Sequence, residues 1–200
     1  YIQSENANAY IYLENNNKLV TTLNSSLKIE KLSSLTINNS FPNNNDRLTV
    51  GSAQCAGIDS NSPLTISGGS VTAFSAYEAG ISNNSLLTIS GGLVTASSTH
   101  GAGISNNSLL TISGGSVTAS SLGGAGISNN SNSSLAINGG SVAASSTSGA
   151  GLSNNNLLTI NRGSVTASSL SGSTTPKNAN GDAVYCCTIS NPQKRKISID

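Results

Sequence analysis

Residues 87–109 read LTISGGLVTASSTHGAGISNNSL, and residues 110–132 read LTISGGSVTASSLGGAGISNNSN, which is nearly the same sequence again. This match belongs to a longer repeat, because the tripeptide Ala-Gly-Ile begins at Ala56, returns three times at intervals of 23 residues, and returns as Ala-Gly-Leu after a further 25. The two extra residues fall between Ile127 and Leu135, with Asn132 and Ser133 as the expected insertion. Self-similarity at such a period is typical of stacked, nearly identical structural units.

Each unit holds three short segments with the composition and alternation of β-strands. Alternation directs Leu87 and Ile89 inward with Thr88 outward, and Val94 inward with Thr95 outward. One coil cannot bury its inner side chains, but coils stacked at about 4.8 Å place equivalent residues in continuous apolar columns. The two main columns are Ile66, Ile89, Ile112, Ile137 and Ile160, and Val71, Val94, Val117, Val142 and Val165. The sequence therefore predicts an all-β fold, a parallel β-helix (β-solenoid) with three short strands per coil of about 23 residues. A β-sandwich would not require the same residue at each position of every unit.

The corners between the strands are predicted from small and amide residues. Glycine pairs such as Gly114-Gly115 take a positive φ without a Cβ clash. A second set of glycines in register, among them Gly103, suits a place where the backbone passes closely. An asparagine recurs at one corner, where amide side chains can hydrogen-bond along the stack. These residues are Asn83, Asn106, Asn129 and Asn154.

The repeat divides the chain into three regions. Residues 1–47 are predicted to form irregular N-terminal coils or a cap, because Leu27-Lys-Ile and Leu35-Thr-Ile keep the theme of the repeat without its spacing. Residues 48–172 are predicted to be the regular solenoid. Residues 173–200 are interpreted as a linker followed by the start of another β segment, from Val184 onward.

Charge and composition disfavour several classes of function. The net charge is +1, only 8% of residues are charged, and Glu78 is the sole charged side chain between Ser60 and Asn161. This stretch therefore lacks the basic surface that binds nucleic acid. No apolar run is long enough to insert into a bilayer. The three cysteines have no metal-ligand spacing, so neither a metal nor another cofactor is expected.

The motif Leu110-Thr-Ile-Ser-Gly-Gly-Ser-Val-Thr-Ala, with Ala102-Gly-Ile before it, resembles the repeats of adhesin-like and carbohydrate-binding parallel β-helix proteins of bacterial surfaces. The resemblance covers about residues 48–171, and Asn180-Gly-Asp-Ala-Val-Tyr resembles the segment that follows such repeats. It implies an extracellular or cell-surface location in a large processed protein, with a structural or adhesive role. The implied partners are extracellular polysaccharide or host and cell-surface glycans. Some relatives hold calcium through carboxylates, but here Asp59 and Glu78 stand on different coils.

An enzymatic role is the least favoured hypothesis. β-Helix polysaccharide lyases and hydrolases need clustered acidic and basic side chains on one face, and the repeats lack such a cluster. His100 and Glu78 lie about one coil apart, but a loop histidine beside a loop glutamate is far more often solvated surface than a catalytic pair. The sequence therefore predicts a protein that is not an enzyme.

The candidate binding surface is one outward face with hydroxyl side chains in a regular array. Its residues are Thr72, Thr95, Ser97, Thr118, Ser120, Thr166 and Ser168. A flat Thr-x-Ser array also resembles ice-binding β-solenoids, although Ala143 and Phe74 interrupt it. Phe74 and Tyr77 are expected in a loop that could form an aromatic patch, whereas Tyr10 and Tyr12 are assigned to packing in the head. A third hypothesis is self-association into filaments through the strand edges at the solenoid ends.

Overall fold

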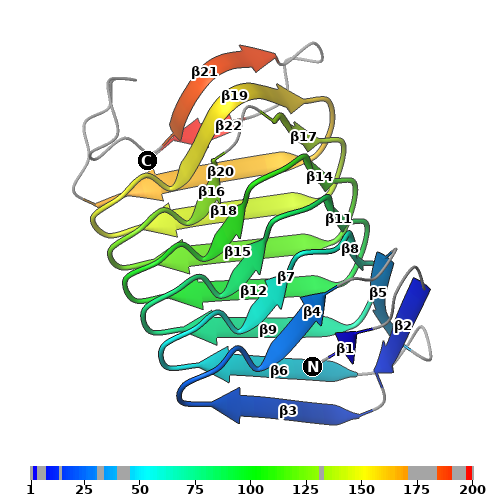
Figure 1. Cartoon of the computed structure of the whole chain (residues 1–200). Coiled ribbons are helices and arrows are strands. Elements are labelled where there is room, and N and C mark those ends of the chain that lie inside the picture. The colour runs from blue at the N-terminus through cyan, green and yellow to red at the C-terminus, as the bar shows by residue number, and fades with distance from the viewer. Residues whose placement is uncertain are drawn as a thin grey trace.

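A computed structural model describes residues 2–3, 8–13, 15–30, 34–39, 46–130, 133–170, 184–190 and 197–199. Its secondary structure is entirely β, and every strand pair is parallel. The chain winds as a solenoid in which each coil contributes one strand to each of three ladders, stacked in order from the N-terminal to the C-terminal end (Figure 1). The predicted fold class is confirmed. The described residues contain no helix that could cross a membrane.

The three ladders form three faces of the solenoid. The first face consists of β1 (Ile2–Gln3), β4 (Leu27–Glu30), β7 (Ile58–Ser60), β10 (Ile81–Asn83), β13 (Ile104–Asn106), β16 (Ile127–Asn129), the first part of β19 (Leu152–Ile160) and β21 (Val184–Ser190). The second face consists of β2 (Asn8–Leu13), β5 (Ser34–Asn39), β8 (Leu64–Ile66), β11 (Leu87–Ile89), β14 (Leu110–Ile112), β17 (Leu135–Ile137) and the ends of β19 and β21. The third face consists of β3 (Asn16–Thr21), β6 (Arg47–Ser52), β9 (Ser70–Ser75), β12 (Leu93–Ser98), β15 (Ser116–Ser121), β18 (Ser141–Ser146), β20 (Ser164–Ser169) and β22 (Ile197–Ile199).

The core consists of the predicted columns. The five isoleucines from Ile66 to Ile160 are completely buried, and the five valines from Val71 to Val165 are at most 1% exposed. Each side chain of this kind stabilises the fold by about 1.5–3 kcal/mol when it leaves water. The identity of the residue at each level is therefore explained by the core, because every coil must fill the same narrow cross-section.

Glycine marks the two places where the backbone has no room for a side chain. Gly115 has a φ of 75° at the corner before β15, as predicted for the glycine pairs. Gly103 lies before β13 with an ordinary φ, but a Cβ there would come within 2.7 Å of the Gly126 carbonyl oxygen and the Ser120 nitrogen. This contact explains the second set of glycines in register.

The irregular spacing at the head does not interrupt the stacking. Leu27 pairs with Ile58, and Leu35 pairs with Leu64, although the spacing along the chain is longer than in the regular repeat. Later, Asn106 pairs with Asn129 while Leu110 pairs with Leu135, so the two extra residues fall between Asn129 and Leu135. Of the expected insertion, Asn132 lies outside the described residues. The boundaries of the three regions remain a prediction, and most of residues 173–200 also lie outside the described part.

Candidate functional site: the serine groove

The third face carries all the hydroxyl residues that the sequence pattern selects. Register places Thr72, Thr95, Thr118 and Thr166 in one file, with Ala143 between the last two, and places Ser97, Ser120, Ser145 and Ser168 in the file beside it. These side chains are half-buried, except that Thr118 is exposed. The structure therefore brings the predicted residues onto one surface, one rung per coil.

A groove of about 700 Å³ runs along the serine file, across β9, β12, β15, β18 and β20. We call it the serine groove. Its floor contains Ser97, Ser120, Ser145 and Ser168, its wall contains Thr99, Leu122, Thr147 and Leu170, and Phe74 lies at its N-terminal end. The predicted serines line the groove, whereas the threonine file lies outside its lining on the flat part of the same face.

The wall of the groove comes from residues that directly follow the third-face strands. Their backbone stays in register, since the Leu122 nitrogen donates to the Ser98 carbonyl at 3.2 Å and the Thr147 nitrogen donates to the Ser121 carbonyl at 3.0 Å. Leu122 is 56% exposed and Leu170 is 84% exposed. The groove therefore offers hydroxyl groups on its floor at about 4.8 Å per coil, and on its wall threonine and exposed leucine alternate from coil to coil.

A second, buried file of serines holds this corner rigid. From β9 to β18 the hydroxyl of the last residue of each third-face strand accepts a hydrogen bond from the nitrogen three residues later, as between Ser98 and Gly101 at 2.9 Å. The same hydroxyl donates to the turn of the preceding coil, as from Ser121 to the Gly101 carbonyl at 2.6 Å. Ser75 and Ser146 repeat this pattern. Buried, fully bonded hydroxyls of this kind pre-organise the wall of the groove.

Phe74 interrupts the serine file, as the array predicts, but it does so as a strand residue and not as the loop residue that was also expected. It lies in β9 and takes the place of serine in the groove file. Its ring lies over Gly51 of the preceding coil, where a Cβ would come within 2.1 Å of the ring. Gly51 therefore makes room for the ring, and the ring closes one end of the serine groove.

Tyr77 and His100 form the aromatic feature beside the groove. Their ring centroids are 4.8 Å apart and their planes differ by 6°. Both side chains are exposed, and the His100 Nδ1 lies 2.9 Å from the Ala76 carbonyl oxygen. From sequence, Glu78 is considered as a partner of His100. In the structure the imidazole instead contacts the Tyr77 ring and the Ala76 carbonyl. The interval of 23 residues between Tyr77 and His100 is the signal that predicts their stacking.

Tyr10 and Tyr12 are not packed in the core, which corrects the assignment made from sequence. Each is 61% exposed on β2, and their rings lie 6.3 Å apart at an angle of 15°. They occupy alternate positions of β2, so both point outward while Leu13 is buried.

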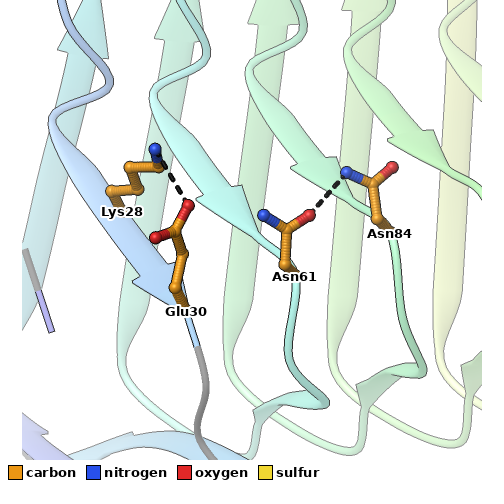
Figure 2. Close-up of polar contacts among 4 residues, drawn as sticks. All are labelled: Lys28, Glu30, Asn61 and Asn84. Carbon is orange, nitrogen blue, oxygen red and sulfur yellow. Dashed lines mark hydrogen bonds and ion pairs between the residues drawn. The ribbon is translucent and has the colours of Figure 1, made fainter. Parts of the chain in front are cut away.

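Three charged side chains, Lys28, Glu30 and Asp59, lie on the first face and not on the face that carries the groove. Lys28 and Glu30 on β4 form an ion pair of 2.9 Å on the first face, and a file of exposed amides continues beside them (Figure 2). In this file the Asn84 Nδ2 donates to the Asn61 Oδ1 at 2.8 Å. The pKa of Asp59 lies above its usual value, mainly because the carboxyl group is partly buried. The Lys28 ammonium opposes this shift by lowering the pKa, and the Glu30 carboxylate adds to it. Among the described residues, no three His, Cys, Asp or Glu side chains are grouped so that they could hold a metal ion.

The fold agrees with comparisons to known proteins. A family model described as carbohydrate-binding domain-containing protein matches residues 2–198. The chain therefore belongs to this carbohydrate-binding domain family. Among solved structures, a polysaccharide lyase-like protein from C. thermocellum superposes with a TM-score of 0.75 at 20% sequence identity, covering 97% of this chain and 79% of that chain. At this identity the likeness is one of fold. A search of curated proteins finds no match.

Proposed function

We propose that this chain is a non-catalytic, extracellular module that binds one extended, uncharged polysaccharide chain along the serine groove. The observation that carries the proposal is the groove itself, which runs along the solenoid axis over five strands and repeats its hydroxyl groups once per coil. A polysaccharide is a periodic, hydroxyl-rich ligand with apolar C–H faces. Hydroxyls on the floor and leucines on the wall match both kinds of surface.

The absence of charge in the groove lining favours an uncharged glycan over a polyuronate. The lining contains serine, threonine, leucine and phenylalanine side chains. A uronate carboxylate is best recognised by arginine or lysine, and desolvating it without such a partner is costly. Glu78, whose nitrogen donates to the hydroxyl of the groove-lining Ser75, would repel it.

The same lining supports binding without catalysis. Hydrolysis of a glycosidic bond requires two carboxyl groups on opposite sides of the bond, and proton abstraction requires a base in contact with the sugar. Among the described residues, the lining of the groove contains no carboxylate, imidazole or ammonium side chain, and His100 lies at its edge and outside the lining. An adhesive role on a cell surface is consistent with this chemistry, because the ligand would be held and released unchanged.

Affinity electrophoresis of the purified chain in gels containing hydroxyethyl cellulose, xylan, galactomannan or polygalacturonate tests the proposal. We expect at least one neutral glycan to retard the chain, and Ser120→Leu to abolish the retardation by filling the floor of the groove. Ser105→Leu is the matched control, since Ser105 is a half-buried, outward serine on the first face. Equal retardation of the two variants would place the ligand elsewhere. No retardation by any neutral glycan, or a preference for polygalacturonate, would overturn the proposal.

Ice binding is a second candidate, favoured by the in-register threonines of the third face. Thr72, Thr95 and Thr118 occupy successive rungs, with Thr166 beyond Ala143. An ice-shaping assay on the same sample distinguishes the two functions. Faceted ice crystals without glycan retention would favour this candidate.

A further inference from the structure

The Tyr77–His100 stack ends abruptly where the next coil has a glycine. Backbone hydrogen bonds keep positions 77, 100, 123 and 148 in register, since the His100 nitrogen donates to the Ala76 carbonyl at 2.9 Å and the Gly123 nitrogen donates to the Thr99 carbonyl at 2.8 Å. The level that follows His100 is therefore occupied by Gly123, and the level after that by Ser148. A third ring could stand at this level, but Gly123 has no side chain to supply it.

One face of the imidazole is therefore left for a ligand. Tyr77 covers one face of His100 with nearly parallel planes, so the opposite face points along the solenoid axis toward the level of Gly123. The distance from the level of His100 to that of Ser148 is two coil spacings, about 9.6 Å, which is enough for one sugar ring in van der Waals contact with the imidazole.

The uncovered face of the His100 imidazole lies next to the serine groove. Thr99 and Leu122, which line the groove, directly precede His100 and Gly123 in the chain. The turn that carries them is closed by the buried hydroxyls of Ser98 and Ser121. The ring is thus held at the edge of the groove by a pre-organised corner, which lowers the entropic cost of binding.

We propose that the face of the His100 imidazole turned away from Tyr77 is a stacking subsite for one pyranose ring of the polysaccharide in the serine groove. This inference rests on the proposed function, because it names a contact made by the same ligand. Tyr77 is a positioning residue, since it stacks on the far side of the imidazole. Gly123 makes the subsite possible by leaving the space empty.

Nuclear magnetic resonance gives a direct test, because His100 is the only histidine of the chain. Cellohexaose, xylohexaose and mannohexaose are titrated into the full chain while the carbon-bound imidazole protons are observed. We expect the hexasaccharide that binds to shift these signals, and stacked sugar protons to move upfield. Saturation by a hexasaccharide with unchanged imidazole signals would overturn the subsite.

Three variants test the same contact by calorimetric affinity. Gly123→Tyr should fill the space and His100→Ala should remove the platform, each weakening binding about 3- to 10-fold, the range expected for one ring-stacking contact. His100→Phe should bind nearly as well as the unaltered chain, since it keeps a ring. Thr88→Tyr, which adds a ring on the second face, is the matched control.

The outcomes separate the subsite from the proposed function. If Ser120→Leu abolishes binding while Gly123→Tyr and His100→Ala bind normally, the groove stands and the subsite is wrong. If none of the hexasaccharides or neutral polysaccharides binds the unaltered chain, both are overturned. Circular dichroism of each variant checks that the β-solenoid is retained.

Discussion

Asn106 shows how one side chain connects three coils. It is completely buried, its Nδ2 donates to the Asn129 Oδ1 at 2.9 Å, and its Oδ1 accepts from the Asn83 Nδ2 at 2.8 Å. Its Nδ2 also donates to the Ser108 carbonyl, which closes the corner of its own coil. A buried amide is stable only when its donors and acceptors are paired, and the repeat supplies these partners from the neighbouring coils.

We expect Asn106→Ala to lower the free energy of unfolding by about 2–4 kcal/mol, because it leaves the Asn129 Oδ1 and the Ser108 carbonyl without this donor and opens a cavity. Urea denaturation followed by circular dichroism measures the loss. Asn107→Ala is the control, since Asn107 is exposed and bonds to the Asn84 Oδ1 at the surface. The control should change stability by no more than about 0.5 kcal/mol. Similar losses for both variants would contradict a special role for the buried file.

Asp59, on the first face, makes the stability of the folded chain depend on pH. Burial is the main cause that raises its pKa above the usual value of 3.8. The folded chain therefore holds this proton more tightly than the unfolded chain, so the contribution of Asp59 to stability is favourable at acidic pH and is lost as the pH rises through the folded pKa. At neutral pH the charged carboxylate opposes folding.

Asp59→Asn should therefore raise the unfolding free energy at pH 7, and the advantage should shrink as the pH falls toward 3.8. Urea unfolding of both proteins at pH 7, 5 and 4 measures the difference. If the variant is less stable at pH 7, attraction to Lys28 outweighs the cost of burial.

At this scale the sequence predicts the asparagine stack but not which amide file is buried. Asn106 and Asn107 are adjacent and both recur every coil, and only the position of the corner relative to β13 directs the first inward and the second outward. The stacking of Tyr77 on His100 could be predicted from the 23-residue period. The exposure of Tyr10 was also predictable, because alternation with Ile11 and Leu13 places it on the outward side of its strand.

At the scale of the strand and its corner, glycine determines how closely successive turns approach. A Cβ at Gly103 would lie 2.8 Å from the Ala96 carbonyl oxygen and 2.7 Å from the Ser120 nitrogen, which are backbone atoms of the sheet and cannot move independently. A Cβ at Gly123 would meet its nearest atoms, the His100 and Thr99 carbonyl oxygens, at 3.2 Å.

Gly103→Ala should therefore destabilise the chain by about 1–3 kcal/mol through overpacking, whereas Gly123→Ala should stay within about 1 kcal/mol of the unaltered protein. Thermal and urea unfolding of the two variants measure the contrast. If Gly103→Ala is as stable as Gly123→Ala, the coils can separate at this corner, and close packing does not explain the glycine.

Alternation within strands predicts the inward and outward residues of the third face, yet it does not predict the groove. The floor serine Ser120 is an outward strand residue, but the wall residue Leu122 follows β15, beyond the last position that a period of two describes. The wall forms because the turn after each strand bends back under the control of buried hydroxyls such as Ser121. A pattern of single residues contains no information about this bend.

At the scale of the whole molecule, the solenoid separates its chemistry by face. The first face carries the amide files and the ion pair of β4, and the third face carries the serine groove and, at its edge, the aromatic stack. Because equivalent residues repeat at each coil, the groove is a linear array in which each rung adds a similar contact. Affinity should thus come from several weak, aligned interactions with a chain-like ligand.

Because the chain carries few charges, the salt dependence of glycan binding tests whether charged groups supply the affinity. Charged residues make up 8% of the sequence and the net charge is +1, so little of the binding energy can come from long-range attraction. The retention of a neutral glycan in affinity gels should therefore change less than about twofold between 20 and 500 mM NaCl, since hydroxyl and stacking contacts are barely screened. A polyuronate held by Lys194, Arg195 and Lys196 would instead be released over this range. Loss of neutral-glycan retention with salt would show that charged groups outside the groove supply the affinity, and the serine groove would then not be the main binding site.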